Sequence, residues 1–365
     1  MSIQRVGIVG RSRAIAIVAA IGGIALAAAA CASPATSPEQ SAPASAPADR
    51  STPSANISTQ VAAVRLPGPP RFVDFAPNGN TAYVSVLNPG VKDKPGWIIE
   101  IDVPSASATR RAQVGVDPEG VAVSDDGTTA YVANSGGSTI STVDTKRAVQ
   151  LNATKLPGME PKGVTLAPDG KRVWVAMWMS NSVVVADTKS NQQVRSIPAG
   201  PWPWSTAISP DGRLVYVAAD HQKALTVIDA RRLARQGDIV LPGKPDDVVL
   251  SPDGKTIYVA LSLQRRVVAV DASTSQIIGT AQMPLGPKAI ALSPDGSRLY
   301  SVDIEEPSTL AVTDTDTMAT LSTTTLPGGC STDIAVSPQG GAILVPNFCD
   351  DILSIVTVTP PGAVQ

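Results

Sequence analysis

The chain contains 365 residues, of which 43% are apolar and only 4% aromatic, and its formal net charge is −2 at pH 7. The pI near 5.5 argues against a nucleic-acid-binding surface, because such surfaces usually show a basic stripe. The one histidine, His221, lies in an expected solvated loop. The absence of GxSxG, CxxC, CxxCH, GxGxxG and Walker motifs leaves no common catalytic, haem or nucleotide-binding signature.

The first thirty residues have the organisation of a secretory signal peptide. Residues 1–13 contain three arginines and no acid, residues 14–30 form an uncharged apolar run, and small residues precede Cys31. The position of this cysteine resembles a bacterial lipobox, in which the Cys is lipidated and becomes the first residue of the mature chain. The usual leucine three residues before the Cys is replaced by Ala28, and Leu26 lies five before it, so cleavage by an ordinary signal peptidase is an alternative. An uncleaved membrane anchor is disfavoured, because the apolar run is slightly short for a bilayer span.

Residues 32–57 consist of little besides Ser, Ala and Pro. Such a composition cannot form a core, so we expect residues 31–57 to be a semi-flexible tether that starts at lipidated Cys31. Fully extended, it would span up to about 80 Å at roughly 3.3 Å per residue. The expected location is therefore extracytoplasmic, on the outer face of the cell membrane, with the membrane as one partner through the lipid.

A short pattern then recurs seven times: a small residue, a Pro-Asp-Gly-like turn and an apolar run. Successive turn glycines are 42–48 residues apart, and a fixed period of this size indicates a repeat architecture. The copies are APNGNTAYV (76–84), SDDGTTAYV (124–132), APDGKRVWV (167–175), SPDGRLVYV (209–217), SPDGKTIYV (251–259), SPDGSRLYS (293–301) and SPQGGAILV (337–345).

Each repeat contains four short strands. In the fifth, KPDDVVLSPDG is followed by KTIYVAL, RRVVAVDAS and SQIIGTAQMPLG, runs rich in Val, Ile and Tyr that are bounded by turn residues. Pro presets the first turn position, Asp bonds to the local backbone and Gly takes the positive-φ site, which predicts a hairpin. The third run ends in an aspartate that is expected to turn the chain into the fourth strand, at Asp102, Asp144, Asp187, Asp229, Asp271 and Asp314. Four strands in about 42 residues are typical of a propeller blade.

The repeats resemble the YVTN family of bacterial β-propellers. YVAN at 131–134 and SPDGKTIYVA at 251–260 carry the resemblance, which extends over roughly residues 60–358. It implies an all-β, seven-bladed β-propeller of four-stranded antiparallel blades, of cell-envelope or secreted type, and says little about function. We therefore expect the propeller to occupy residues 58–360, followed by a tail at 361–365.

The last repeat lacks a fourth strand, while a surplus strand, STQVAAVRLPG at 58–68, precedes the first hairpin. We predict that 58–66 pairs with 352–358 as the outermost strand of blade seven, which leaves no bare sheet edge.

Cys330 and Cys349 flank the last hairpin. Its turn lies at 338–341, so the two cysteines are equally far from the turn and should face one another across the strand pair. In an oxidising compartment this predicts a disulfide, with two free buried thiols as the alternative.

The innermost strands of a propeller begin around the mouth of the central channel. One position after the opening proline, or its equivalent, stand Arg71, Glu119, Lys162, Trp204, Asp246, Lys288 and Thr332, and the next position adds Asp247 and Asp333. The oxygen-rich set that could bind Ca²⁺, as in propeller lactonases, is Glu119, Asp246, Asp247 and Asp333. The alternative, which we favour, is that the interleaved cations neutralise these acids, so that no cofactor is required.

Two loops of neighbouring blades carry three of the five tryptophans. MWMS at 177–180 follows the second strand of blade three, and PWPW at 201–204 leads into blade four. Such loops share a face of a propeller, so we expect a partner-binding patch formed by Met177, Trp178, Met179, Trp202 and Trp204. The alternative is a rigid structural cap of prolines on tryptophans. Trp174 stands at the usual tyrosine position and is expected in the core.

These observations favour a monomeric, lipid-anchored binding module for an unidentified envelope protein or small ligand, without catalytic activity. The alternative is a lactonase-like hydrolase with a metal ion at the channel mouth. A nucleic-acid binder is the least favoured class because of the acidic pI.

Overall fold

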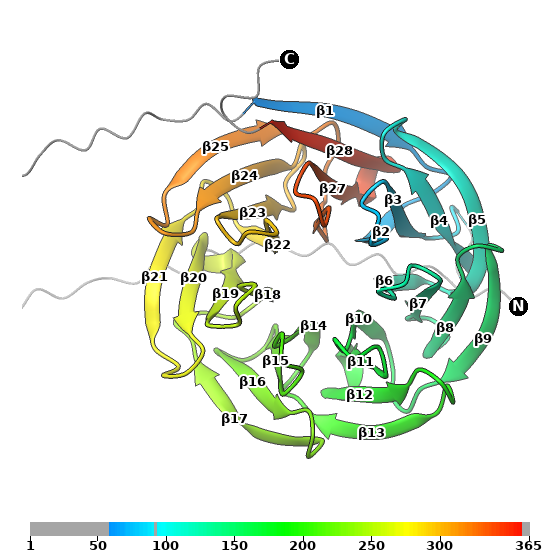
Figure 1. Cartoon of the computed structure of the whole chain (residues 1–365), viewed down its shortest axis with the longest axis horizontal. Helices are drawn as coiled ribbons and strands as arrows, with labels where there is room; N and C mark the ends of the chain where they lie inside the picture. The colour runs from blue at the N-terminus through cyan, green and yellow to red at the C-terminus, as the bar shows by residue number, and fades with distance from the viewer. Residues whose placement is uncertain (1–57, 91–92, 360–365) are drawn as a thin grey trace, which may run out of the picture. The chain divides into compact units, whose positions relative to one another are not determined.

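Seven four-stranded antiparallel sheets are arranged as the blades of a ring in the computed structural model, which describes residues 58–90 and 93–359 (Figure 1). The fold class expected from the repeats is confirmed. The predicted signal peptide (1–30), tether with Cys31 (31–57) and tail (361–365) lie outside the described residues.

The strands occupy equivalent places in successive blades. The innermost strands are β2 (Pro70–Phe75), β6 (Pro118–Val123), β10 (Pro161–Leu166), β14 (Pro203–Ile208), β18 (Asp247–Leu250), β22 (Pro287–Leu292) and β26 (Ala335–Val336). The second strands are β3 (Thr81–Val86), β7 (Thr129–Asn134), β11 (Arg172–Met177), β15 (Leu214–Ala219), β19 (Thr256–Leu261), β23 (Arg298–Asp303) and β27 (Ala342–Asn347). The third strands are β4 (Pro95–Asp102), β8 (Thr139–Asp144), β12 (Ser182–Asp187), β16 (Ala224–Asp229), β20 (Arg266–Asp271), β24 (Thr309–Asp314) and β28 (Ile352–Thr359). The outermost strands are β5 (Ser107–Val116), β9 (Val149–Lys155), β13 (Gln193–Pro198), β17 (Ala234–Val240), β21 (Ile277–Gln282), β25 (Thr320–Thr325) and, in blade seven, β1 (Ser58–Arg65).

The Pro-Asp-Gly turns have the geometry that the sequence predicts. In blade five, Asp253 Oδ1 accepts hydrogen bonds from Ser251 Oγ at 2.7 Å and from the backbone N–H of Lys255 at 3.0 Å. These bonds lower the pKa of Asp253 to about 2. Gly254 adopts φ = 71°, and a side chain there would also collide with Pro210 of the preceding blade, at 2.9 Å. Glycine is therefore required at this position both by the turn and by the packing of neighbouring blades.

The aspartate that ends each third strand closes the next turn. Asp271 Oδ1 accepts the backbone N–H groups of Ser273 at 3.0 Å and Thr274 at 2.7 Å, and Ser275 follows in the left-handed region with φ = 60°. Equivalent bonds form at the other five aspartates of the series: Asp102, Asp144, Asp187, Asp229 and Asp314. The turning role expected for these residues is confirmed.

The hydrophobic core lies between adjacent blades. One cluster joins Tyr216 and Leu225 of blade four to Ile257 and Val259 of blade five. Because both faces of each blade are covered by neighbours, the second strands are buried almost continuously and do not alternate between apolar and polar residues.

Strand β1 closes the ring by pairing with β28 along its full length, from Ser58 opposite Thr359 to Arg65 opposite Ile352 (Figure 1). The predicted closure is confirmed. Val64 and Leu66 are each 5% exposed and pack with Val84 and Ile99 of blade one, so the first strand contributes both an edge and part of the core at the closure.

Blade seven departs from the other blades at its innermost strand. The sequence suggested a full strand in TDIAVSP, but β26 contains only Ala335 and Val336. The preceding segment is held differently: Cys330 forms a disulfide with Cys349, as predicted, with a Cα–Cα distance of 5.6 Å. The buried hydroxyl of Ser331 also donates a hydrogen bond to Asn347 at 2.9 Å. Covalent and side-chain links therefore replace part of the backbone ladder.

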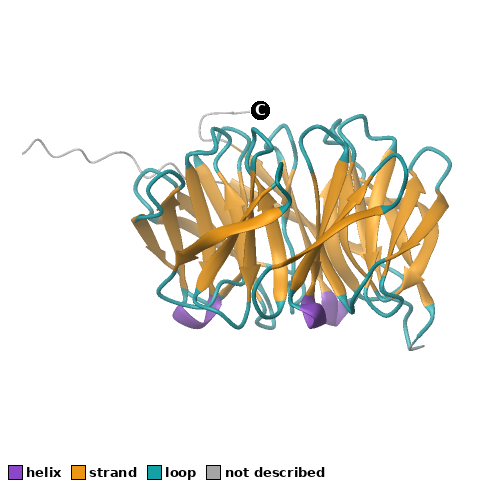
Figure 2. Ribbon diagram, turned by 90° about the horizontal axis from the view of Figure 1, so that it is seen from below, coloured by secondary structure: helices purple, strands orange, loops and turns teal. Residues whose placement is uncertain are grey.

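The ring has two different faces. The connection face carries the segments between blades and three short 3-10 helices, η1 (Trp178–Ser180), η2 (Ser262–Gln264) and η3 (Phe348–Asp350), which lie on one side in Figure 2. The opposite face, which we call the turn face, carries the Pro-Asp-Gly turns.

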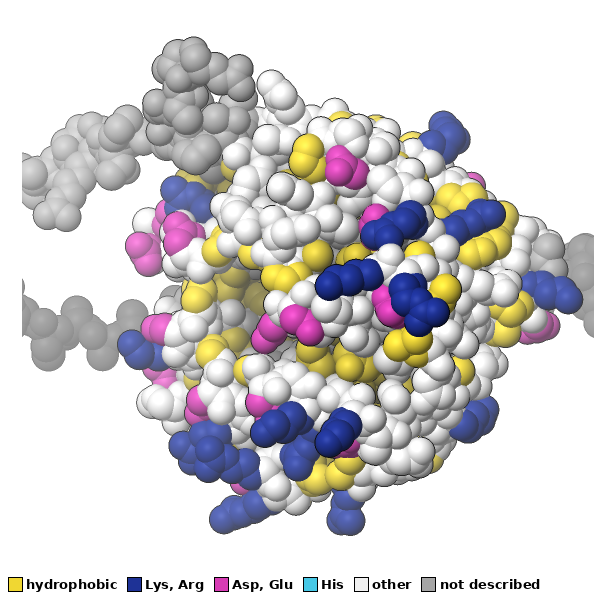
Figure 3. Space-filling model, turned by 45° about the vertical axis from the view of Figure 1, so that its right-hand side comes forward, with side chains coloured by type: hydrophobic (Ala, Val, Ile, Leu, Met, Phe, Trp, Pro, Cys, Tyr) yellow, Lys and Arg dark blue, Asp and Glu magenta, His cyan; other side chains and the backbone are white. Residues whose placement is uncertain are grey.

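Lys and Arg side chains are interspersed with Asp and Glu over the side seen in Figure 3. Among the described residues, no helix is long and apolar enough to cross a bilayer.

Candidate functional site

The charged side chains at the channel mouth are paired with one another. Arg71 donates to both carboxylate oxygens of Glu119, at 2.9 and 3.1 Å, and Lys162 Nζ lies 3.0 Å from the same carboxylate. These three side chains are at most 14% exposed. Lys288 Nζ lies 3.1 Å from Asp246. Two of the four carboxylates considered for Ca²⁺ are therefore neutralised by neighbouring cations.

The other two carboxylates bind backbone groups of the next blade. Asp247 accepts the backbone N–H groups of Val248 and Ile290, both at 2.8 Å. Asp333 accepts the backbone N–H of Val73 at 2.8 Å and so joins blade seven to blade one inside the channel. Burial raises the pKa of Asp247 to about 6 and that of Asp333 to about 8.

Asp74 plays the same part between blades one and two, which the sequence reading missed. It accepts the backbone N–H groups of Phe75 and Val123, both at 2.8 Å, and burial raises its pKa to about 7. Asp74 lies two positions further along its strand than Asp247 and Asp333, beyond the two positions after the opening proline at which the sequence predicted channel-mouth side chains.

Asp74, Asp247 and Asp333 line a channel cavity of about 760 Å³. Within the described part of the chain, Glu119, Asp246, Asp247 and Asp333 do not bring three ligand oxygens within 4.8 Å of one another. Their partners are cations and backbone N–H groups, so the geometry favours neutralisation and blade-to-blade bonding over the Ca²⁺ hypothesis.

Trp178 and Trp202 converge on the connection face from neighbouring blades. Their ring centroids are 4.9 Å apart, with planes inclined by 51°. His221 lies in a loop of blade four, and its ring centroid is 3.7 Å from that of Trp202, with the two rings tilted relative to one another. Lys162 Nζ lies 5.6 Å from the Trp178 ring centroid, within the range of a cation–π contact. Three loops thus build one aromatic cluster with a cation beside it.

Hydrogen bonds donated by backbone N–H groups hold these loops in place. Trp178 N–H donates to Glu160 O at 2.9 Å, Trp202 N–H donates to Asn181 Oδ1 at 3.1 Å, and Asp220 N–H donates to Trp202 O at 3.1 Å. Trp202 has φ = 58°, and Glu160, at the same place one blade earlier, has φ = 54°. The left-handed conformation of this tryptophan is thus a property of the repeat, and it sets the direction in which the indole projects.

The methionines of this region differ in how far they are buried. The prediction for Met177 is wrong: as the last residue of β11 it is 0% exposed and packs in the core between blades two and three. Met179, two residues on, is 44% exposed. Met159 was missed, although it is 58% exposed and its N–H donates to Ser180 Oγ at 2.8 Å, which places its loop against η1. Its place in the connection into blade three, on the same face of the ring as the two tryptophans, is the sequence feature that could have identified it.

Trp204 lies in β14 at the channel and not in a loop. Lys288 Nζ lies 4.6 Å from its ring centroid, and the Phe72 ring lies 6.2 Å away. Lys162 Nζ, 5.7 Å from the Trp204 ring centroid, connects it to Trp178. Trp204 therefore belongs to the channel mouth. The remaining group, which we call the Trp–Met patch, consists of the half-buried Trp178 and Trp202 and the exposed Met159, Met179 and His221.

The Trp–Met patch combines packed aromatic rings with exposed thioethers. Its aromatic rings are held in place before any ligand arrives, while its thioethers are exposed and adaptable. Trp174, by contrast, is 1% exposed in the core, as expected for the tyrosine position of the repeat.

Comparison with known proteins identifies the fold alone. No protein-family model matches the chain, and no curated protein matches it. A solved structure described as Kuenenia stuttgartiensis Hydrazine Synthase matches with a TM-score of 0.70 and 24% sequence identity, over 82% of this chain and 97% of that chain. Since 1864 chains of solved structures match and one fold supports many functions, the likeness carries no activity with it. The chain is thus a seven-bladed β-propeller, similar in fold to the propeller in that structure.

Proposed function

We propose that the protein is an extracytoplasmic binding module, lipid-tethered at Cys31, which docks an apolar segment of a partner protein on the Trp–Met patch. The observation that carries the proposal is the preformed Trp178–Trp202–His221 stack flanked by exposed methionines. The hydrolase alternative would need carboxylates free to hold a metal ion, and those at the mouth already bind cations or backbone groups.

The shape of the patch supports a protein partner. The two indoles and the imidazole lie against one another, and Met159 and Met179 add exposed apolar surface beside them. Tryptophan and methionine are enriched at protein interfaces, and preformed aromatic anchors reduce the entropy lost on binding. A few such anchors typically supply most of the affinity.

The direction of the first strand supports the tethered arrangement. Ser58 lies opposite Thr359, so β1 starts at the turn face and runs toward the connection face. The chain that precedes β1 therefore joins the propeller at the face opposite to the Trp–Met patch. The resemblance of the repeats to YVTN propellers agrees with a cell-envelope role.

Site-specific photo-crosslinking tests the proposal. A benzoyl-phenylalanine at position 179 is expected to capture a discrete envelope protein in cells. The matched control is position 263, because Leu263 occupies the same place in η2 of blade five and is 73% exposed. Equal capture at both positions, or none at position 179, would rule out the patch as the docking site.

A double substitution separates binding from folding. Trp178→Ala with Trp202→Ala should weaken capture at least about thirty-fold, because a single aromatic anchor is typically worth about 2 kcal/mol or more. The melting temperature should stay close to that of the parent. A sharp fall in melting temperature would instead identify the two tryptophans as a structural cap, and unchanged capture would exclude them as anchors.

A further inference from the structure

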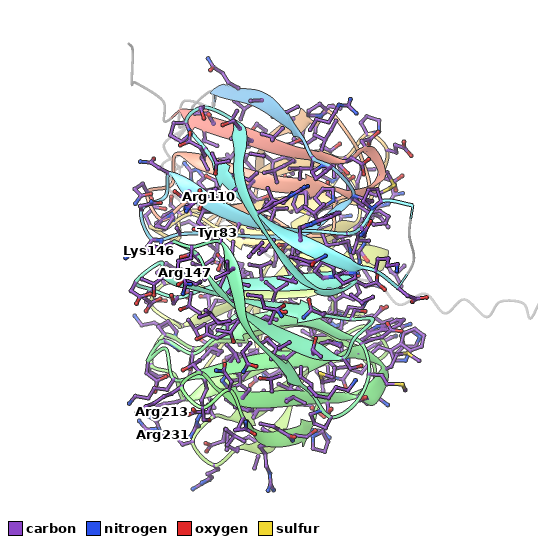
Figure 4. The ribbon with its side chains drawn as sticks, turned by 90° about the vertical axis from the view of Figure 1, so that its right-hand side faces the viewer. Tyr83, Arg110, Lys146, Arg147, Arg213 and Arg231 are labelled. Atoms are coloured by element: carbon purple, nitrogen blue, oxygen red, sulfur yellow. A yellow bond between two sulfur atoms is a disulfide. The ribbon has the colours of Figure 1, made fainter. Side chains whose placement is uncertain are left out.

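A second recess lies on the turn face, between blades one and two. It has a volume of about 280 Å³, and its walls include Tyr83, Glu100, Arg110, Asp126 and Lys146. Figure 4 shows Arg147 near Lys146 and Arg110 at this end of the blades. We call this recess the blade-one groove. It is remote from the Trp–Met patch, which is on the opposite face.

The groove borders a smaller recess of blade one, and the two share Tyr83, Glu100 and Arg110. The left-handed residue after the third strand packs on the preceding blade in blades three and six: Asn191 accepts a hydrogen bond from Thr142, and Met318 lies over Gly279. The corresponding residue of blade two is Ala148, with φ = 51°. It lines the smaller recess together with Glu100 and Arg110 of blade one.

Those side chains are a charged pair that the other blades lack. Glu100 stands opposite Arg110 in the β4–β5 register, where blades four, five and six place Val227 and Gly237, Ala269 and Gly279, and Val312 and Ser322. Glu100 is 12% exposed and accepts hydrogen bonds from Thr109 at 2.7 Å, Arg110 Nε at 3.0 Å and Tyr83 at 3.3 Å. Although burial opposes ionisation, the bonds from Arg110 and Thr109 lower the pKa of Glu100. Glu100 therefore keeps its charge at a partly buried position, and the repeat fold does not require a charged residue there.

The guanidinium of Arg110 is held in place with part of its surface free. Its Nη1 donates to Lys146 O across the blade boundary at 2.6 Å, and its side chain is 47% exposed. Lys146 and Arg147 are exposed, and no carboxylate of the described residues lies within 4.0 Å of either side chain. Two positively charged side chains, Arg110 and Lys146, thus line the groove, and Glu100 neutralises only the first of them.

The opposite rim offers an acceptor. Asp126 Oδ1 accepts bonds from Ser124 and Thr128, which lower its pKa to about 2, so the carboxylate is ionised. Its Oδ2 makes no hydrogen bond within the described structure and remains free to accept one from a hydroxyl or amino group.

We infer that the blade-one groove binds a small ligand that carries an anionic group together with hydroxyl or amino hydrogen-bond donors. The anionic group lies against Arg110 and Lys146, where charge-assisted hydrogen bonds are strongest. A hydroxyl or amino group of the ligand donates to Asp126. A carboxylate and a phosphate ester share this chemistry, and the volume restricts the ligand to the size of a small metabolite.

Calorimetric titration of the full chain tests this inference. The probes are glycerate for the carboxylate arm, glycerol 3-phosphate for the phosphate arm and glycerol as the neutral control. One or both anions should bind at millimolar concentration, and glycerol should not. Failure of both anions, or equal binding of glycerol, would overturn the inference.

Two substitutions locate the binding. Lys146→Gln should lower the affinity for the anion about tenfold. Lys189→Gln, at the same place in the equivalent turn of blade three, should leave it unchanged. Equal effects of the two lysine variants would exclude the groove as the site.

Discussion

The closure of the ring by β1 leads to the sharpest stability prediction. Removing residues 1–56 takes away none of the contacts described in the propeller. Removing residues 1–66 takes away the whole pairing with β28, the hydrogen bond from Leu66 N–H to Asp351 O at 2.8 Å and two buried side chains. The two truncations therefore differ by one structural element.

The size of the effect follows from burial. Val64 and Leu66 are each 5% exposed, and full burial of such side chains contributes about 1.5–3 kcal/mol each, so the loss is about 3–6 kcal/mol before the exposed edge of β28 is considered. For a domain of this size that lowers the melting temperature on the order of 10 °C. Differential scanning calorimetry at one scan rate gives the comparison, and denaturant unfolding gives the free energies.

A matched pair of point variants controls for general damage to the strand. Val64→Ala should reduce the free energy of unfolding by about 2 kcal/mol, since it removes buried methyl groups. Val61→Ala, three residues away on the same strand, should change it little, because Val61 is 38% exposed. Equal melting temperatures for the two truncations, or equal effects of the two valine variants, would refute the closure argument.

Three further predictions concern other parts of the chain. Replacing Cys330 and Cys349 by Ala opens a loop of 19 residues and should destabilise the domain by about 3 kcal/mol, which thermal melts with and without reductant would measure; a melt that reductant does not change would contradict this. Asp333 has a folded-state pKa near 8, above its unfolded value, so the stability that it contributes is complete below pH ~4 and is lost as pH rises through ~8. Relative to the Asp333→Asn variant, the parent should lose stability across that window, and parallel pH profiles would refute the assignment. Cys31→Ala should release the mature chain from the membrane fraction, whereas continued fractionation with membranes would exclude lipid anchoring there.

Local rules in the sequence were sufficient to predict the blades. Each Pro-Asp-Gly turn and each strand-ending aspartate acts within a few residues, through a positive φ at Gly254 or an accepted N–H at Asp271. These interactions are the same wherever the repeat occurs, so their recurrence predicted the number of blades and the missing strand of the last one. The hairpin geometry around Cys330 and Cys349 was equally local, and the disulfide was predicted from it.

The candidate sites depend on contacts that cross blade boundaries. The sequences MWMS and PWPW were enough to predict that Trp178 and Trp202 lie together, but they could not show that Met177 faces the core. Trp204 was expected both in the patch and, from its place after the opening proline, at the channel mouth, and the structure has it at the channel. Met159 and His221 join the patch from two other loops, each unremarkable in sequence. The interblade hydrogen bonds of Asp74 and Asp333 were hidden for the same reason.

The sequence by itself determined the repeat, the blade count and the closing strand, because these depend on backbone preferences and short-range periodicity. Only the tertiary structure decided which side chains are free to bind. A side chain at a blade boundary is covered or exposed according to the residues that the neighbouring blade places against it, as Met318 of blade six covers Gly279 of blade five. That outcome is set by packing between blades, which no pattern within a single repeat contains.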